Sequence, residues 1–315
     1  MSSTLTAICL PLLALTAVAA SAGLAAADCS ALLERFNSAL AVRSIPEAKA
    51  IEAQVAADAV CGERLAEVQR GRAGLQLDLA TRLMSGGAPD PQVEQLLMEA
   101  AAPEVLWQAA KAVGDFRFSQ RRYAEATVAF ERALEIIEHP GKTRRAPAAV
   151  TIRQIFDRAT QSRLLAANEE DQQRPAIYVA ANQRDGTPSG SFSEDIRGFK
   201  PKVIPLPIRF ETASAVLSPI GTKAAEELLQ VLRHQPPKQV TIVGHTDERG
   251  GDAYNLRLSE ERAKTVKRYL QEHGIAAEIT AIAKGKREPL AIENASGFTR
   301  EELWALNRRV EWRRE

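Results

Sequence analysis

Asp247 and Arg262 are the side chains whose types and spacing best suit chemistry in this chain of 315 residues. Asp247 closes the segment 244–247, and Arg262 follows 15 residues later (262 − 247). A carboxylate and a guanidinium held on rigid elements favour a zwitterionic ligand, because each charge then meets its opposite. The alternative interpretation is a surface salt bridge, worth about 0–1 kcal/mol.

The residues around Asp247 predict a strand followed by a loop. Residues 239–243 form a short apolar run, which indicates a buried strand, and Asp247 follows at its carboxyl end, where α/β sheets tend to bind ligands. Gly250 and Gly251 indicate a permissive loop. Asn255 is of a type that ties such loops through side-chain hydrogen bonds.

Arg262 is expected on a helix that runs from Ser259 to Gln271, with Ser259 as its N-cap. Arg262 is then the third helical residue, and its side chain points back toward the free N–H groups of the first turn. Those groups and the guanidinium together favour a carboxylate. Leu258 is expected to anchor the helix start in the core.

His245 invites a catalytic or metal-binding interpretation, together with Asp247 and Asp252. The other three histidines lie in unrelated segments, so no second histidine is spaced to share a metal. The chain also lacks the GxSxG, HExxH and paired-cysteine motifs. We therefore expect a histidine packed at a strand end, no cofactor, no metal and no enzymatic activity.

These motifs occur together over residues 201–315, about a third of the chain. In this order they resemble the OmpA-like peptidoglycan-binding domain found at the C-terminus of OmpA, Pal and MotB proteins. The matching residues are Phe210, Glu211, Gly244, His245, Thr246, Asp247, Gly250, Asn255, Leu258, Ser259, Arg262, Ala263, Asn307, Arg308, Arg309 and Val310.

The resemblance implies a non-catalytic domain that binds the diaminopimelate of the peptidoglycan stem peptide. Asp247 is expected to receive its ammonium group and Arg262 its carboxylate. Thr246, Asn255 and Leu258 are expected to line the pocket, and one of Arg308 or Arg309 to add a contact. The domain is expected to be α/β (α+β), with a mixed sheet and two main helices, because helices between strands imply crossover connections.

Residues 28–180 are predicted to be all-helical. Within them, one unit resembles a tetratricopeptide repeat, with residues 120–122 as the turn between two helices; its residues are Gly114, Asp115, Phe116, Tyr123, Ala126, Phe130 and Ala133. A generic helical hairpin is the alternative. Residues 181–200 are rich in polar turn formers and are predicted to be a flexible linker.

Residues 1–27 are predicted to be a signal peptide, because the apolar stretch 5–27 ends in a small-x-small site at residues 25–27. The same stretch is long enough to span a bilayer, which needs about 20 residues, so a retained anchor is the alternative. Either way we expect an exported protein of the periplasm that is associated with the cell wall, with the outer membrane as the expected site of attachment.

Two of the three cysteines, Cys29 and Cys61, follow the predicted signal. In an oxidising compartment this pair indicates a disulfide that closes a loop of about 32 residues and contributes roughly 3–4 kcal/mol. Lipidation of Cys29 is the alternative, but Asp28 stands where such a site needs a small residue.

The formal net charge of +1 argues against a nucleic-acid partner, because such proteins usually carry a basic excess. The sequence therefore predicts a cell-wall anchor whose helical domain recruits an envelope protein partner. A cell-wall hydrolase or amidase accessory and a purely scaffolding helical-repeat protein are the rival interpretations.

Overall fold

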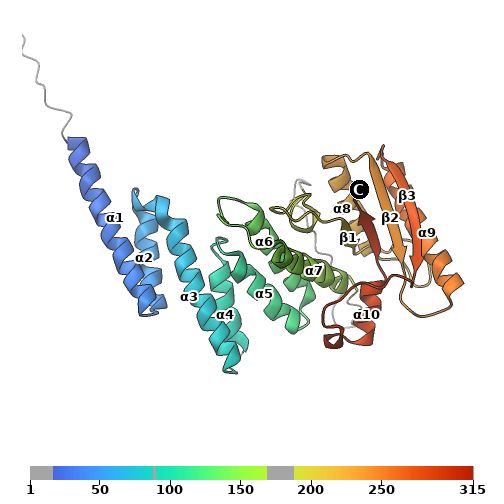
Figure 1. Cartoon of the computed structure of the whole chain (residues 1–315), viewed down its shortest axis with the longest axis horizontal. Helices are drawn as coiled ribbons and strands as arrows, with labels where there is room; N and C mark the ends of the chain where they lie inside the picture. The colour runs from blue at the N-terminus through green and yellow to red at the C-terminus, as the bar shows by residue number, and fades with distance from the viewer. Residues whose placement is uncertain (1–16, 88–89, 169–187, 315) are drawn as a thin grey trace, which may run out of the picture. The chain divides into compact units, whose positions relative to one another are not determined.

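The computed structural model describes residues 17–87, 90–168 and 188–314. It contains two compact units, Met1–Leu79 and Ala80–Glu315 (Figure 1). Most of the predicted signal segment lies outside the described residues. In the three described ranges, no helix combines the length and the apolar character that a membrane crossing requires.

The first unit is built from helices joined by short turns. They are α1 (Ala17–Ala41), α2 (Ile45–Ala57), η1 (Cys61–Arg64) and α3 (Leu65–Ser85), whose last residues belong to the second unit. Ser44 caps α2 by accepting a hydrogen bond from the Glu47 N–H. The predicted disulfide between Cys29 and Cys61 is confirmed, and it lies within the apolar cluster of this unit, beside Phe36.

The second unit begins with further helices: α4 (Asp90–Ala101), α5 (Trp107–Ser119), α6 (Tyr123–Glu138) and α7 (Ala149–Ala166). The predicted hairpin with its turn at residues 120–122 is confirmed. A Cβ on Gly114 would lie 2.7 Å from the Phe130 ring, so α5 and α6 approach closely there. The tetratricopeptide character of this hairpin stays a prediction.

A four-stranded mixed sheet follows, in the order β1-β4-β2-β3. Its strands are β1 (Val203–Leu206), β2 (Gln239–His245), β3 (Glu278–Gly285) and β4 (Val310–Arg313). β2 and β3 are parallel, whereas β4 is antiparallel to β1 and β2. The predicted mixed sheet is confirmed, as are its two main helices, α8 (Pro219–His234) and α9 (Asp252–Glu272). Helix α10 (Arg300–Asn307) was not predicted.

The two faces of the sheet differ in character because side chains alternate along each strand. Ile204, Trp312 and Ile242 stand in register across three strands and are buried together with residues of α8 and α9. The intervening residues Glu311 and Arg313 point to the opposite, polar face. The hydrophobic core therefore lies between the sheet and its helices.

The same core continues into the preceding helices, since Phe130 and Ile155 belong to one apolar cluster with the sheet residues. Residues 188–193 are buried as well. The Ser191 N–H and hydroxyl donate to the Glu131 carboxylate at 2.8 Å and 2.5 Å. This part of the predicted 181–200 linker is thus packed, because the buried carboxylate needs donors. Helices α4–α7 share a compact unit with the sheet, whereas we had expected a domain boundary between them.

Candidate ligand-binding site

The end of strand β2 fixes the position of the candidate site. A Cβ on Gly244 would lie 2.1 Å from the backbone oxygen of Ser259, so strand and helix α9 are closer than any other residue allows. The Thr246 N–H donates to the Gly285 carbonyl at 2.9 Å, just after an irregularity in the β2–β3 pairing. The chain therefore leaves the sheet at a defined point, immediately before Asp247.

Asp247 is only 6% exposed and is surrounded by donors. Its Oδ1 accepts from the backbone N of Arg249 at 3.1 Å, and its Oδ2 accepts from Arg249 Nη2 at 2.7 Å and Arg308 Nη1 at 3.0 Å. Burial raises the pKa of Asp247, but the hydrogen bonds from Arg249 and Arg308 outweigh it and hold the pKa below its usual value. The carboxylate is therefore charged at neutral pH.

Arg262 lies in the middle of helix α9, so the predicted N-cap at Ser259 is wrong. The helix begins at Asp252, ten residues before Arg262 (262 − 252). Ser259 is an interior residue, whose hydroxyl donates to Leu256 O at 2.8 Å and accepts from the Gly285 N–H at 2.9 Å. The free N–H groups of the helix start are more than two turns away from Arg262 and do not assist it.

The Arg262 side chain is held by two contacts. Its Nε donates to Ser214 O at 3.0 Å, and its guanidinium lies 5.0 Å from the Phe210 ring centre. Burial lowers the pKa of Arg262, and the charge of Asp247 acts against that shift. The two residues form no direct ion pair, and Ser214 is the only hydrogen-bond partner of the guanidinium in the described parts of the chain. Its Nη groups are therefore available to a carboxylate.

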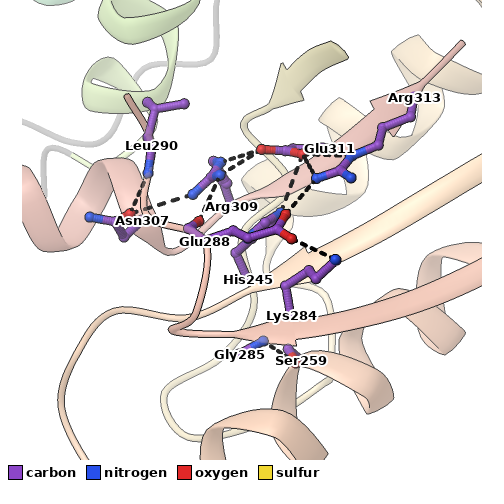
Figure 2. Close-up of polar contacts among 10 residues, drawn as sticks. All are labelled: His245, Ser259, Lys284, Gly285, Glu288, Leu290, Asn307, Arg309, Glu311 and Arg313. Atoms are coloured by element: carbon purple, nitrogen blue, oxygen red, sulfur yellow. Dashed lines mark hydrogen bonds and ion pairs between the residues drawn. The ribbon is translucent and has the colours of Figure 1, made fainter. Parts of the chain in front are cut away.

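The adjacent residues Arg308 and Arg309 point to different places. Arg308 follows α10 and contacts Asp247. Arg309 is buried on the polar face of the sheet, where its Nε and Nη2 donate to Glu311 Oε1 at 2.8 Å and 2.6 Å, and its Nη2 also to Glu288 O at 3.2 Å (Figure 2). Of the two predicted alternatives, the structure brings only Arg308 to Asp247.

The three residues expected to line the pocket have different environments. Asn255 is buried, and its Nδ2 donates to Arg249 O at 2.8 Å, so this side chain ties the loop as expected. Thr246 is buried next to Asp247, and its hydroxyl has no hydrogen-bond partner among the described residues. Leu258 is half-buried on α9. The buried Asn255 side chain thus stabilises the conformation of the loop.

Two residues at the site were missed in the sequence, Arg249 and Trp304. Arg249 pairs with Asp247, and its guanidinium lies 4.4 Å from the Trp304 ring centre. Trp304 Nε1 donates to Glu248 Oε1 at 3.1 Å. Arg249 follows Asp247 by two residues, a spacing that could have indicated an ion pair. Trp304 lies on a helix that was not predicted.

His245 is buried at the end of β2, as expected for a packed histidine. Burial lowers its pKa, although its Nε2 lies 3.3 Å from Glu311 Oε2. No group of three or more potential metal ligands is assembled anywhere in the described ranges. Asp247 and Arg262 can hold charges of both signs, and His245 packs at the strand end that Asp247 follows.

Residues 209–300 match the model of the OmpA family, and this part of the chain is an OmpA family domain. The peptidoglycan-associated lipoprotein of Pseudomonas aeruginosa is 39% identical over 103 residues, which cover 32% of this chain and 58% of that protein. The peptidoglycan-binding protein ArfA of Mycobacterium bovis is 33% identical over 136 residues, 43% of this chain and 40% of that protein.

A similar solved structure is that of the peptidoglycan-associated lipoprotein from Burkholderia pseudomallei. It is 32% identical, covers 34% of this chain and 86% of that chain, and has a TM-score of 0.28. The matches to the two curated relatives span about half of their lengths, 58% and 40%. The names of the two curated relatives designate a peptidoglycan-associated and a peptidoglycan-binding protein.

Proposed function

We propose that this protein is a non-catalytic component of the cell envelope that binds peptidoglycan through its OmpA family domain. The observation that carries the proposal is a buried carboxylate, Asp247, near enough to a guanidinium, Arg262, for their charges to interact; the Nη groups of Arg262 have no hydrogen-bond partner among the described residues. The names of the relatives, which designate peptidoglycan-associated and peptidoglycan-binding proteins, support the same ligand.

In this proposal the ligand is the diaminopimelate of the stem peptide, whose ammonium and carboxylate lie on one carbon. The ammonium binds Asp247 in place of the Arg249 side chain, which is 56% exposed and therefore easily displaced. The carboxylate binds the Nη groups of Arg262, with Arg308 as a second cation nearby. Thr246 and Leu258 contact the remainder of the ligand. A single domain should bind modestly, and many sites on the polymer raise the avidity.

The location of the protein and the role of its helices are part of the same proposal. The protein acts in the periplasm, where its disulfide is stable and peptidoglycan is accessible. The helices outside the OmpA family domain recruit an envelope protein partner, while the domain holds the protein at the wall.

The decisive test is co-sedimentation of the purified protein with sacculi that contain diaminopimelate. Asp247→Ala and Arg262→Ala should each reduce affinity by about 30-fold or more, because loss of one member of a buried charge contact costs roughly 2–5 kcal/mol. Asp252→Ala and Arg257→Ala, exposed residues at the start of the same helix, serve as matched controls and should bind normally. Normal binding by both site variants would sink the proposal.

Sacculi in which lysine replaces diaminopimelate test whether diaminopimelate is the residue that the protein recognises. Lysine retains the ammonium group but lacks the side-chain carboxylate, so Arg262 has nothing to bind. Wild-type protein should therefore prefer the diaminopimelate polymer, and Arg262→Ala should lose that preference. Equal affinity of the wild type for both polymers would exclude diaminopimelate recognition, even if wall binding remained.

A further inference from the structure

Arg308 is anchored at two points, and one of them lies outside the OmpA family domain. Its Nη1 donates to Asp247 Oδ2 at 3.0 Å, and its Nη2 donates to Asn168 Oδ1 at 2.7 Å. Asn168 is the second residue after helix α7, 140 residues earlier in the chain than Arg308. Arg249, the other cation on Asp247, stacks on the Trp304 ring and donates to no second side chain among the described residues. The two arginines therefore differ in how firmly they are held.

The end of α7 is itself fixed to the segment that carries Arg308. Arg209 is 9% exposed, and its Nη2 donates to Leu164 O, a carbonyl in the last turn of α7. Its Nη1 donates to Ala305 O at 3.0 Å and to Arg308 O at 2.6 Å. One buried guanidinium thus joins the C-terminal end of α7, the end of α10 and the backbone of Arg308. These bonds hold Leu164, four residues before Asn168, close to the backbone of Arg308.

Further contacts make α7 a rigid neighbour of the domain. Arg163 Nη2 and Glu227 Oε2 form a buried ion pair at 2.5 Å, which joins α7 to α8. Leu165 of α7 and Leu306 of α10 belong to one apolar cluster. Glu302 of α10 accepts from Tyr123, the first residue of α6, and from Arg121 in the turn before it. Breaking a buried ion pair of this kind is strongly destabilising, so α7 stays in place.

We propose that α7 is part of the ligand-binding site and that Asn168 is a positioning residue, which holds the Arg308 guanidinium against Asp247. The proposal rests on the proposed function. Asn168 fixes a long side chain in one rotamer, so that less conformational entropy is lost when the ligand carboxylate arrives. It also keeps Arg308 in place when the ammonium group displaces Arg249. The binding module therefore begins at α7 and is longer than the family domain at 209–300.

The test uses full-length protein and a soluble muropeptide with a diaminopimelate stem peptide, titrated by calorimetry. Asn168→Ala should weaken binding about three- to tenfold, the equivalent of one typical hydrogen bond. Asn168→Asp keeps the acceptor and adds a charge, so it should bind at least as tightly as the wild type. In an Arg308→Ala background, Asn168→Ala should cause no additional loss. Asn37→Ala, the same change at an exposed position, is the matched control.

Unchanged affinity of Asn168→Ala overturns the proposal, and so does an additive effect in the double variant. If Asp247→Ala and Arg262→Ala also bind normally, the proposed function itself has failed. A measurement without ligand separates the two cases. NMR titration of the Asp247 carboxyl should show a higher pKa in Asn168→Ala, since a loosened Arg308 stabilises the carboxylate less; an unchanged pKa contradicts the positioning role. Asn168→Ser, whose side chain is too short to reach the Arg308 guanidinium, serves the same comparison if Asn168→Ala does not fold.

Discussion

Two clusters of charged residues lie at the same end of the sheet and use arginine in opposite ways. In the closed cluster, Glu311 accepts from Arg309 and Arg313, and Arg309 is itself only 4% exposed (Figure 2). In the open cluster, Asp247 is equally buried but its nearest partner, Arg249, is largely exposed to solvent. In the closed cluster each charge is paired with a residue of the protein. In the open cluster a ligand can replace Arg249 as the partner of Asp247.

The difference shows how neighbouring residues acquire separate roles. Arg308 and Arg309 are adjacent in sequence, but β4 begins at Val310 and Arg309 follows the alternation of that strand onto its polar face. Arg308 still belongs to the end of α10 and points to Asp247. The boundary between a helix and a strand therefore separates a charge that is buried in the fold from one that we propose takes part in recognition.

The largest expected effect is a loss of stability in the closed cluster. Glu311→Ala leaves the buried Arg309 cation without its carboxylate, which should lower the free energy of unfolding by about 3–5 kcal/mol. Glu288→Ala is the matched control: it removes a half-exposed carboxylate that also pairs with Arg313, and should cost at most about 1 kcal/mol. Urea denaturation measures both. Equal losses of unfolding free energy in the two variants would show that burial does not determine how much these ion pairs contribute to stability.

Gly244→Ala is the change expected to disturb both clusters. Its Cβ would meet the Ser259 backbone at 2.1 Å, and backbone cannot move aside as a flexible side chain can. Forcing β2 and α9 apart should cost about 1–3 kcal/mol of stability. It should also weaken ligand binding, because Asp247 and Arg262 lie on the two separated elements. Binding equal to that of the wild type, measured with folded protein, would show that the site tolerates this separation.

The sequence was informative where structure depends on local patterns. The apolar run at 239–243 located β2, and the OmpA-like residues identified the domain at the level of the family. The start of α9 was missed because its first two turns carry mostly exposed side chains around Asn255, without an apolar stripe. The sequence around Asn255 contains no pattern that indicates that the helix has already begun.

The link between α7 and the site could not be predicted from local patterns at all. It depends on ion pairs and hydrogen bonds between residues far apart in the chain, such as Arg163 with Glu227 and Arg308 with Asn168. Each of these residues alone resembles an ordinary surface residue. Their partners are set by how the helices pack, which a pattern of apolar residues does not specify. The same reason explains why Arg308 and Arg309 were indistinguishable as site candidates.

A smaller effect is expected from Arg249→Ala in the open cluster. Arg249 occupies the carboxylate that the ligand ammonium is proposed to bind, so its removal should increase affinity, by up to about fivefold because an exposed ion pair contributes at most about 1 kcal/mol. Titration with the soluble muropeptide measures the change. Weaker binding would mean that Arg249 contacts the ligand itself and does not compete with it.

The smallest effect concerns pH. Between pH 7 and pH 5, we expect acid to reduce stability through His245, which contacts Glu311 of the closed cluster, but not to change ligand binding at the open cluster. Burial lowers the pKa of His245, so the folded protein resists a proton that the unfolded chain binds below about pH 6.5. His245 therefore contributes stability that is lost as the pH falls. The pKa of Asp247 is already below its usual value, so this carboxylate stays charged throughout. Affinity per folded molecule should accordingly remain constant.

The comparison of wild type with His245→Gln isolates this contribution. Glu131, whose pKa burial raises to about 7, acts with the opposite sign, since protonation of the buried carboxyl favours the fold as the pH falls, but it is common to both proteins and cancels. The free energy of unfolding should change less favourably on acidification in the wild type than in His245→Gln. Identical pH dependences of the unfolding free energy would mean that His245 titrates normally in the fold. A fall in ligand affinity by pH 5 would mean that the open cluster is no more resistant to acid than the closed cluster.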